Sequence, residues 1–342
     1  MKILTIAAAI VGMAVMVGLV FYFGAGAVLR SLLAVGITGF AAICAMQLAL
    51  TAVMGLAWRA LLPGVSTGAV IWARLVRDSV AEALPLPQVG GYVLGARALA
   101  LAGVSGTLAA ASTIVDVTLE FVAQLPYTAL GLALLVWLQP DTPVAAPVLL
   151  GLAVAGVAAA AFVLVQRRGF NYVDRIAGIL GVGWAERSAA GAAALHATLL
   201  DIYRGRLGLW VSFALHFVCW IASAGQVWLA WWLAGSPLSF GAVLAIESVM
   251  YAIRTAAFVV PQAVGVQEGA YILLGAGFGL TPDMSLALSF LKRGRDFALG
   301  LPPIAIWQGI ESRRLWRRRA GPTPRIGEAA APVSDRAAPP RD

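Results

Sequence analysis

The chain has 342 residues, of which 61% are hydrophobic and 12% are charged, and its mean hydropathy is +0.88. Water-soluble domains carry about 25% charged residues, so this composition excludes a soluble globular protein and predicts one that crosses a membrane several times. The formal net charge of +8 comes from arginines scattered over separate segments, which argues against a nucleic-acid partner and favours anionic lipid headgroups.

The first predicted crossing is the apolar run 3–23, which follows Lys2. It is longer than the roughly 7–15-residue core of a cleaved secretory signal, so we expect an uncut membrane anchor. Further runs reach the roughly 20 residues that span a bilayer, and together with the first they predict an all-α bundle with six full crossings. These runs are 32–57, 108–138, 144–165, 208–234 and 284–310.

Positively charged residues predict the orientation of the crossings, because they are enriched in cytoplasmic connections. Arginines are frequent in 58–78, in 166–208 and in the tail after 310, and they are absent from 139–147 and 235–240. We therefore expect both termini on the cytoplasmic side of a bacterial inner membrane. The membrane domain should comprise 1–310 with a cytoplasmic loop at 166–208, and 311–342 should form a basic, disordered tail.

Two apolar regions, 69–104 and 241–280, are interrupted by Pro, Gly and charges, and they resemble each other. The first contains DSVAEALPLPQVGGYVLGARALALAGVSG from Asp78, and the second contains ESVMYAIRTAAFVVPQAVGVQEGAYILLGAGFG from Glu247. Both have an acid followed by Ser-Val, then Pro-Gln with a nearby Val-Gly, then Gly-Ala, and last Ala-Gly. This shared order favours an internal repeat, about 69–138 and 241–310, over chance similarity between segments rich in Ala and Gly.

Three predicted crossings, 108–138, 144–165 and 208–234, separate the interrupted regions 69–104 and 241–280, so the second region should be inverted relative to the first, as in many transporters. Pro87 and Pro261 interrupt helices, and Gly90, Gly91 and Gly265 allow sharp turns. Each copy is therefore predicted to form a re-entrant helical hairpin with its Pro-Gln tip near mid-bilayer. Irregular backbone at that depth survives only where protein or a polar cavity covers it, which predicts a wet cavity between the tips.

Ionisable residues recur inside the predicted crossings and hairpins. Asp116 and Glu120 lie four positions apart on one helix face, and Lys292 begins a charged group in the last crossing. A charge at a helix centre costs about 2.5–3.5 kcal/mol, so these groups must pair internally or line water. A structural salt-bridge network and a functional polar path both stay open. The residues assigned to a substrate path are Arg77, Pro87, Gln88, Gly90, Gly91, Arg97, Asp116, Glu120, Glu247, Arg254, Pro261, Gln262, Gly265, Glu268, Arg293 and Asp296.

No motif in the chain points to a metal, a nucleotide or a catalytic nucleophile. Cys44 and Cys219 lie in separate apolar runs, and His196 and His216 have no partner motif. We therefore interpret all four as core side chains, and we expect neither a cofactor nor an enzymatic activity.

Four segments in order carry a resemblance to a known family: VRDSVAEALPLPQVGG, VDVTLE, PQAVGVQEGAYILLG and SFLKRGRD. They resemble the flippase-like membrane domain of lysylphosphatidylglycerol synthases, and most closely its hopanoid-biosynthesis-associated branch. The resemblance covers about 1–310 and implies translocation or handling of lipids. The recurrent family residues map here to Arg77, Gly90, Asp116, Glu120, Arg254, Pro261, Gly265, Glu268 and Arg293.

The chain departs from the family pattern at two places. Tyr92 stands where the family often has Glu after the first Gly pair, and Ala81 and Glu82 stand where it often has Asn. A mechanism that needs the family carboxylate would here depend on Glu82. No soluble synthase domain follows residue 310, so aminoacyl transfer is not expected of this chain.

Three functions are compatible with these patterns. The leading one is a lipid flippase that binds a headgroup between the two tips, with membrane lipids as partners: a hopanoid, or an anionic or aminoacylated phospholipid. The second is a membrane enzyme with Asp116 and Glu120 as acid and base. The third is a scaffold that binds enzymes of lipid biosynthesis through 166–208, where Tyr172, Trp184 and Tyr203 lie among basic residues.

Overall fold

The computed structural model describes Ala14, Gly18, Phe21, Tyr22 and residues 25–83, 88–168, 185–235, 238–257 and 260–319. The chain divides into two compact units, Met1–Ile304 and Ala305–Asp342, and all the sites considered below lie in the first. The predicted crossing 3–23 lies almost entirely outside the described residues, and so does most of the predicted disordered tail 311–342. The start of that tail, 311–319, is helical rather than disordered. The crossing 3–23 and the disorder after Arg319 stay predictions.

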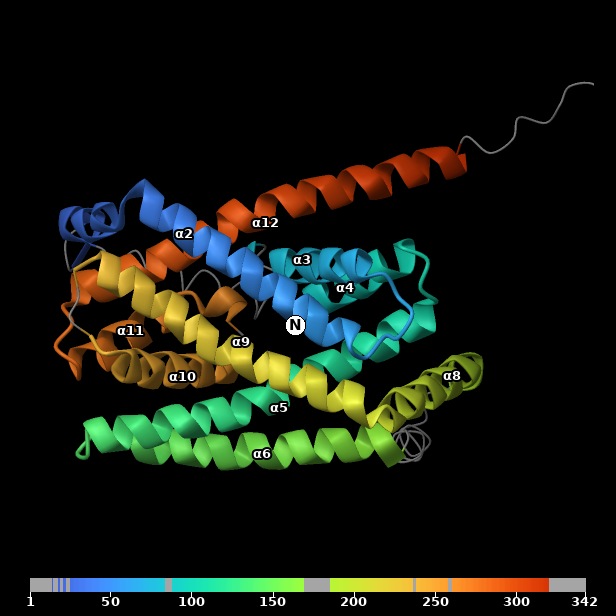
Figure 1. Cartoon of the computed structure of the whole chain (residues 1–342), viewed down its shortest axis with the longest axis horizontal. Helices are drawn as coiled ribbons and strands as arrows, with labels where there is room; N and C mark the ends of the chain where they lie inside the picture. The colour runs from blue at the N-terminus through green and yellow to red at the C-terminus, as the bar shows by residue number, and fades with distance from the viewer. Residues whose placement is uncertain are drawn as a thin grey trace, which may run out of the picture. The chain divides into compact units, whose positions relative to one another are not determined.

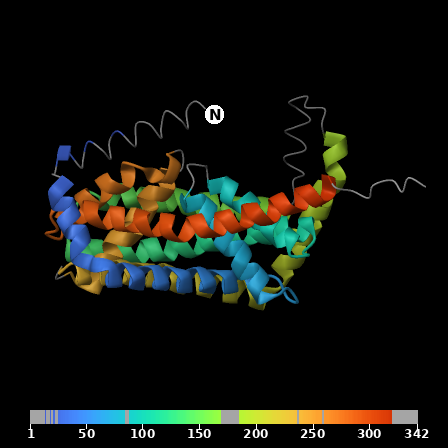
Figure 2. The same cartoon turned by 90° about the horizontal axis from the view of Figure 1, so that it is seen from above.

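Four predicted crossings are confirmed as helices long and apolar enough to span a membrane. They are α2 (Ala25–Arg59, through its segment Leu33–Arg59), α5 (Gly106–Leu138), α6 (Ala145–Arg168) and α9 (Arg206–Leu233). Glycine interrupts the first of these, because Gly36 adopts φ 68° and ψ 172°, and Figure 2 shows the resulting bend in α2. The described chain is thus a helical membrane protein.

The last predicted crossing, 284–310, lies inside α12 (Pro282–Arg319). This helix begins at a proline, whose fixed φ suits the first helical position. Its charged residues set it apart from the four apolar spans found among the described residues. A further helix, α8 (Ala185–Arg204), precedes α9 across a break at Gly205. The count of six full crossings therefore stays a prediction.

The first interrupted region forms two helices, α3 (Thr67–Ala83) and α4 (Gln88–Leu101), which pack along each other. Their close approach depends on glycine. A Cβ added at Gly91 would lie 2.6 Å from the carbonyl oxygen of Arg77, and one added at Gly95 would lie 2.7 Å from the Arg77 Cβ. The structure therefore has a helix on each side of 84–87, as the sequence predicted.

The second interrupted region has the same order of elements. It contains α10 (Phe240–Ala256), a 3-10 turn η1 (Pro261–Ala263) and α11 (Val266–Ala276), and α10 packs on α11. The helices α3 and α10 both have 17 residues, and each hairpin leads into a long helix, α5 or α12. The internal repeat of about 69–138 and 241–310 stays a prediction.

The two hairpins approach the middle of α5 from opposite ends, as Figures 1 and 2 show. Arg77 of α3 donates to Asp116, in the first half of α5, at 2.6 Å. One and a half turns later along α3, Glu82 pairs with Arg254 in the last turn of α10. The ends of α3 and α10 therefore meet beside the central part of α5.

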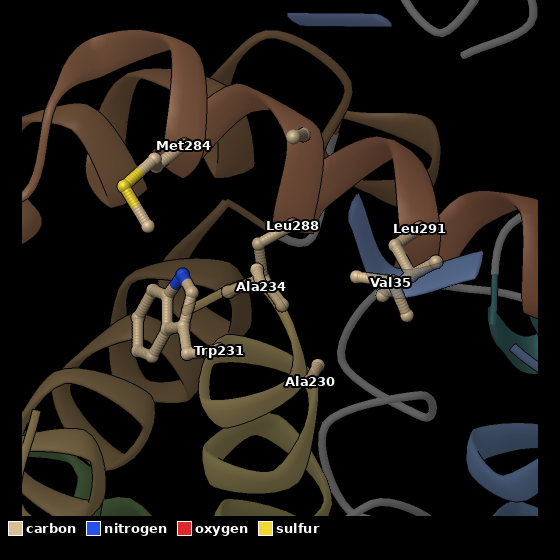
Figure 3. Close-up of a pocket in the computed structure, with 8 residues that line it drawn as sticks. Val35, Ala230, Trp231, Ala234, Met284, Leu288 and Leu291 are labelled. Carbon is tan, nitrogen blue, oxygen red and sulfur yellow. The ribbon is translucent and has the colours of Figure 1, made fainter. Parts of the chain in front are cut away.

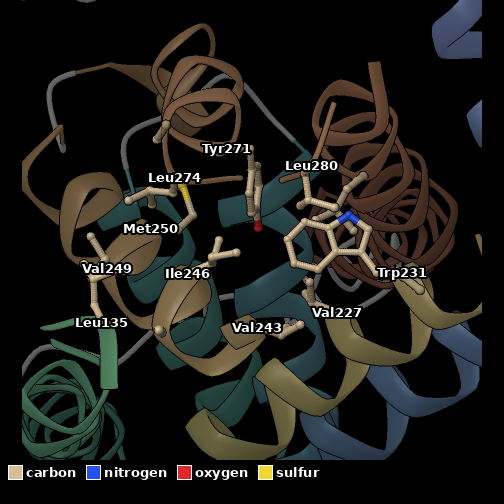
Figure 4. Close-up of a cluster of buried hydrophobic side chains, with 14 of the residues drawn as sticks. Leu135, Val227, Trp231, Val243, Ile246, Val249, Met250, Tyr271, Leu274 and Leu280 are labelled. Atoms are coloured by element: carbon tan, nitrogen blue, oxygen red, sulfur yellow. The ribbon is translucent and has the colours of Figure 1, made fainter. Parts of the chain in front are cut away.

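Helix α10 lies along the second half of α5. Gln124, near the centre of α5, donates to Thr255 in the last turn of α10 at 3.0 Å. A Cβ at Gly131 would overlap the side chain of Ser248, so α10 and α5 are closest there. Around this contact, apolar side chains of α5, α9, α10 and α11 form the main buried cluster, part of which is drawn in Figure 4. Between membrane helices such packing at small residues is a main source of association.

We predict that Gly131→Ala weakens the fold, because its methyl group must displace Ser248 and with it α10. The expected loss is about 1–3 kcal/mol, the usual cost of an overpacked contact, measured as a lower midpoint of thermal unfolding in detergent. Gly151→Ala in α6 is the matched control, because nothing lies within 4 Å of its added Cβ. Equal effects of the two substitutions would contradict the close approach of α5 and α10.

Candidate functional site

Two arginines of α3 meet the acidic face of α5 in a buried group, which we call the arginine cluster. Asp116 is fully buried and lies within 3.3 Å of Arg74 Nη1 and 2.6 Å of Arg77 Nη1. His216 of α9 places Nε2 3.0 Å from the other oxygen of Asp116. One carboxylate is therefore held by groups from two different helices. The cluster comprises Arg74, Arg77, Asp78, Asp116, Glu120 and His216.

Glu120, one helical turn after Asp116 on α5, completes the arginine cluster. Arg74 Nη2 donates to its Oε1 at 2.9 Å, and Arg77 Nη2 donates to its Oε2. Asp78 accepts from Arg74 Nε at 2.8 Å. Asp116 and Glu120 thus share one face, as their spacing of four predicted, and both arginines bridge them. Paired guanidinium and carboxylate groups of this kind remove most of the cost of burying either charge.

The second hairpin carries the opposite charges, in what we call the lysine cluster: Glu247, Tyr271 and Lys292. Lys292 Nζ of α12 donates to Glu247 Oε2 of α10 at 2.8 Å and to the Tyr271 hydroxyl of α11 at 2.6 Å. The Tyr271 hydroxyl donates to the other oxygen of Glu247. Here the hairpin supplies the acid and the following long helix supplies the base, whereas α3 supplies bases to acids of α5. The charge arrangement is reversed between the two copies.

Glu268 fixes the turn of the second hairpin. It accepts from the Gly265 amide at 2.7 Å, from Ser289 Oγ at 2.7 Å and from Arg293 Nε at 2.8 Å. The turn before it is strained, because Gln262 and Ala263 have φ of 52° and 47°, a region that residues with a Cβ rarely adopt. Such strain persists only where surrounding contacts hold it, and Glu268 provides several of them.

We predict that Glu268→Gln loosens this turn, because an amide cannot accept from all of these donors. The loss of one charge-assisted contact should lower stability by about 1.5–3 kcal/mol and speed amide hydrogen exchange in 260–268. Asp141→Asn, at an exposed acid between α5 and α6, is the control and should leave exchange there unchanged. Unaltered exchange in Glu268→Gln would contradict a role for this carboxylate in holding the turn.

Within the described residues an ion pair joins the two hairpins, and we call it the tip pair. Arg254 Nη2 donates to Glu82 Oε2, and the side chains are 13% and 33% exposed. Glu82 is the residue that stands near the position where the resembling family has Asn. Its partial exposure distinguishes the tip pair from the arginine and lysine clusters, whose central acids Asp116 and Glu247 are fully buried.

Arg295 and Asp296 of α12 pair with each other, and Arg295 also reaches α9. Arg295 donates to Asp296 Oδ1 at 2.6 Å and also to Gln226 Oε1, while Gln226 Nε2 donates to the Ile43 carbonyl of α2 at 2.8 Å. The charges in α12 that the sequence required to pair internally or to line water are therefore paired internally.

Several site residues expected from the sequence are brought together, and others are not. The two clusters and the tip pair contain five of them: Arg77, Asp116, Glu120, Glu247 and Arg254. Glu268 bonds Gly265 and Arg293 at the turn of the second hairpin, and Asp296 pairs with Arg295. Gly90 and Gly91 lie in the first turn of α4, and Arg97 is exposed further along it. Pro87 and the side chains of Gln88 and Pro261 lie outside what the structure describes. Gln262 lies in the strained turn, and its role stays a prediction.

Two members of the arginine cluster, Arg74 and His216, were not predicted as site residues from the sequence. His216, which the sequence presents as an isolated core histidine, contacts Asp116 across 100 positions. Arg74, counted among the cytoplasmic charges, is only 2% exposed and is held by three acids. A weak signal existed for Arg74, because Asp78 follows it at the spacing of a helical ion pair. No local pattern could have revealed His216.

A polar chain connects the membrane helices to α8. Gln166 of α6 donates to Thr118 of α5 at 2.9 Å and accepts from the Tyr203 hydroxyl at 2.7 Å. Burial raises the pKa of Tyr203 to about 12, so the phenol stays protonated and able to donate. Tyr203 therefore faces the bundle. Tyr172 and Trp184, the other aromatic residues of the predicted docking segment 166–208, lie outside the described residues.

Among the described residues no group of three or more His, Cys, Asp or Glu side chains is placed to hold a metal ion. A small apolar pocket lies between α2, α9 and α12, where Val35, Trp231 and Leu288 line it (Figure 3). The wet cavity expected at the hairpin tips stays a prediction.

Comparison with known proteins identifies the family of this chain. Neither the curated proteins nor the solved structures yield a match to this chain. A family model, described as "Lysylphosphatidylglycerol synthase TM region", matches residues 6–303. That match covers most of the chain and the whole set of clusters, so the protein belongs to the lysylphosphatidylglycerol synthase transmembrane family.

Proposed function

We propose that this protein translocates a lipid across the membrane, with the headgroup passing between the two hairpins while the hydrocarbon chains stay in the bilayer. The observation that carries the proposal is the tip pair, Glu82 with Arg254. It joins two hairpins that enter the bundle from opposite ends, the arrangement of re-entrant inverted repeats around a midplane site in transporters.

The partial exposure of the tip pair supports a role in contact with a polar headgroup. A fully buried pair such as Lys292 with Glu247 is costly to separate, whereas a partly exposed pair can exchange its partner for another charged group at lower cost. A headgroup with both an acidic and a basic group could replace each partner in turn. This favours a zwitterionic or aminoacylated phospholipid, and a polar hopanoid is the alternative within the same proposal.

We further propose that the protein changes the position of its lipid and not its covalent structure. Asp116 and Glu120, the candidate acid and base, are each bridged by two arginines. Carboxylates held in this way are stabilised as anions and are poor proton acceptors. Conversion of a candidate lipid by the purified protein into a product of different mass would support the enzyme hypothesis and contradict this part of the proposal.

Reconstitution tests the translocation directly. Vesicles containing the protein and a fluorescent lipid are treated with a membrane-impermeant quencher, using phosphatidylglycerol, lysylphosphatidylglycerol, phosphatidylethanolamine and a polar hopanoid as probes. At least one probe should lose protected fluorescence faster than in vesicles that contain an unrelated polytopic protein. Rates equal to this control for every probe would contradict the proposal.

A further inference from the structure

Four arginines gather where the end of α6, the end of α8 and the start of α9 come together at one end of the bundle (Figure 1). All four are exposed, and we call them the basic edge: Arg167, Arg168, Arg204 and Arg206. Asp201 is the one acid in 163–168 and 198–211, and it pairs with Arg204 at 2.7 Å. Four positive charges against one negative charge leave an excess of three. The basic edge therefore attracts a partner with negative charge.

Tyr203 attaches the basic edge to the membrane helices. Its hydroxyl donates to Gln166 Oε1 at 2.7 Å, which joins the end of α8 to the end of α6, and Gln166 donates in turn to Thr118 of α5. The guanidinium of Arg167 lies over the Tyr203 ring, 6.0 Å from its centroid, at the outer limit of a cation–π contact. The arginines of α6 and α8 are therefore carried by a packed part of the bundle rather than by a free loop.

Exposed apolar side chains adjoin the basic edge on both membrane helices. On α6, Leu164 is 48% exposed and lies four positions before Arg168. On α9, Trp210 is 70% exposed and lies four positions after Arg206. Residues four apart share a helix face. Because α6 ends and α9 begins at this edge, each helix presents an arginine at its end and an apolar side chain one turn toward the middle of the span.

This order of cation and hydrocarbon matches one class of molecule. An anionic phospholipid carries its phosphate at the membrane surface and its acyl chains toward the bilayer centre. Arginine binds phosphate oxygens through paired N–H donors, and arginines near a membrane surface attract anionic lipids. A soluble phosphate compound would use the arginines alone and would not contact Leu164 or Trp210. The pattern at the basic edge therefore favours a lipid over a soluble anion.

We propose that the basic edge binds an anionic phospholipid of the surrounding membrane. Its phosphate contacts the arginines of α6 and α9, and its acyl chains lie against Leu164 and Trp210. With the orientation expected from the sequence, this lipid belongs to the cytoplasmic leaflet. The site lies at the end of the bundle, whereas the hairpin ends meet beside the central part of α5. The bound lipid is therefore distinct from the one proposed to move between the hairpins, and the inference does not depend on translocation.

Lipid titration followed by native mass spectrometry tests this site without requiring transport. The full-length protein in detergent is titrated with phosphatidylglycerol or with phosphatidylcholine of the same acyl chains, and the dissociation constant of the first bound lipid is measured. Phosphatidylglycerol should bind at least about tenfold more tightly, because each arginine near an anionic lipid contributes roughly fivefold in affinity. Arg167→Gln and Arg206→Gln should each weaken its binding about fivefold and leave the midpoint of thermal unfolding unchanged, because both side chains are exposed.

Two further substitutions are matched controls, because each removes one arginine elsewhere in the chain. Arg313→Gln changes an exposed arginine of α12 beyond residue 304, and Arg254→Gln changes the tip pair. Both variants should keep the wild-type preference for phosphatidylglycerol. Soluble glycerophosphoglycerol, which has the headgroup without acyl chains, should not displace the bound lipid at equal concentration.

Equal affinity for the two lipids would overturn the proposal. A loss in Arg313→Gln as large as in Arg167→Gln would do the same, because it would indicate attraction to net charge alone. Loss of the preference in Arg254→Gln would locate the lipid between the hairpins, which contradicts the basic edge and supports the proposed function. Displacement by glycerophosphoglycerol would show that the ligand is a soluble anion and not a lipid. A negative result in the quencher assay would contradict the proposed function and leave this site in place.

Discussion

Glu82→Arg is expected to reduce lipid translocation by at least about tenfold, the effect of roughly 1.4 kcal/mol on a rate. The substitution places two guanidinium groups where the tip pair now joins the hairpins, and like charges in a partly buried site repel. Arg254→Glu should be equally damaging, because it brings two carboxylates together. The double substitution Glu82→Arg with Arg254→Glu restores an ion pair of reversed direction and should recover most of the rate in the quencher assay.

Charge reversal on the surface provides the control for this experiment. Asp201 pairs with Arg204 on α8, and both side chains are largely exposed, so Asp201→Arg should leave translocation unchanged. Recovery in the double variant depends on direct contact between positions 82 and 254. If the double variant is as impaired as each single one, the tip pair does not act as a unit in transport.

Asp116→Ala is expected to cost the fold about 3–5 kcal/mol, the usual effect of removing one partner from a buried ion pair. Asp116 is fully buried and contacts Arg74, Arg77 and His216. Its loss leaves the two buried guanidinium groups with only Asp78 and Glu120 to offset their charge. The measurement is the free energy of unfolding in mixed micelles, followed by the fluorescence of the tryptophans.

Asp201→Ala is again the matched comparison, because its exposed ion pair should contribute no more than about 1 kcal/mol. The experiment also separates the two interpretations that the sequence left open for the buried charges. A cost of several kcal/mol at Asp116 indicates a dry structural network. A cost close to that at Asp201 would show that water reaches the arginine cluster, and would contradict the dry, paired site described above.

The paired short helices of the two interrupted regions could be predicted from the sequence because their signals are local. Proline and glycine next to glutamine interrupt two apolar regions in the same order, and the physical effect of these residues on a helix needs no knowledge of the rest of the chain. The four apolar spans were predictable for the same reason, since a run of about 20 apolar residues has few alternatives to crossing a membrane.

The choice of ion-pair partners could not be predicted in the same way. Glu82 and Arg254 are 172 positions apart, and Asp116 and His216 are 100 apart. The sequence showed that charges in the crossings needed compensation, because the cost of an unpaired charge is general. Which acid meets which base depends on how the helices pack, and that is decided by contacts such as Gly131 against Ser248 rather than by spacing along one helix.

The structure also revises one argument about orientation. Arg74 and Arg77 were counted with Arg59 as cytoplasmic charges, yet both are buried in the arginine cluster. Buried, paired arginines carry little weight in the rule that positive loops stay inside. The expected orientation of both termini in the cytoplasm therefore depends on the arginines of 166–208 and of the tail.

The depth of the hairpin ends in the bilayer tests the central claim most directly. In a variant with Cys44 and Cys219 replaced by alanine, a spin label is attached in turn at Val89, at the start of α4, and at Ala256, the last residue of α10, both exposed. Val218 in the middle of α9 and Trp137 near the end of α5, also exposed, serve as references for the bilayer centre and its edge. Collision with oxygen and with a water-soluble nickel complex then reports depth.

Labels at Val89 and Ala256 should lie at similar depth, close to that of Val218 and far from that of Trp137. Two hairpins of opposite direction that meet at mid-membrane require this result. Labels at the depth of Trp137, or at two different depths, would contradict the opposed re-entrant hairpins and the translocation path between them.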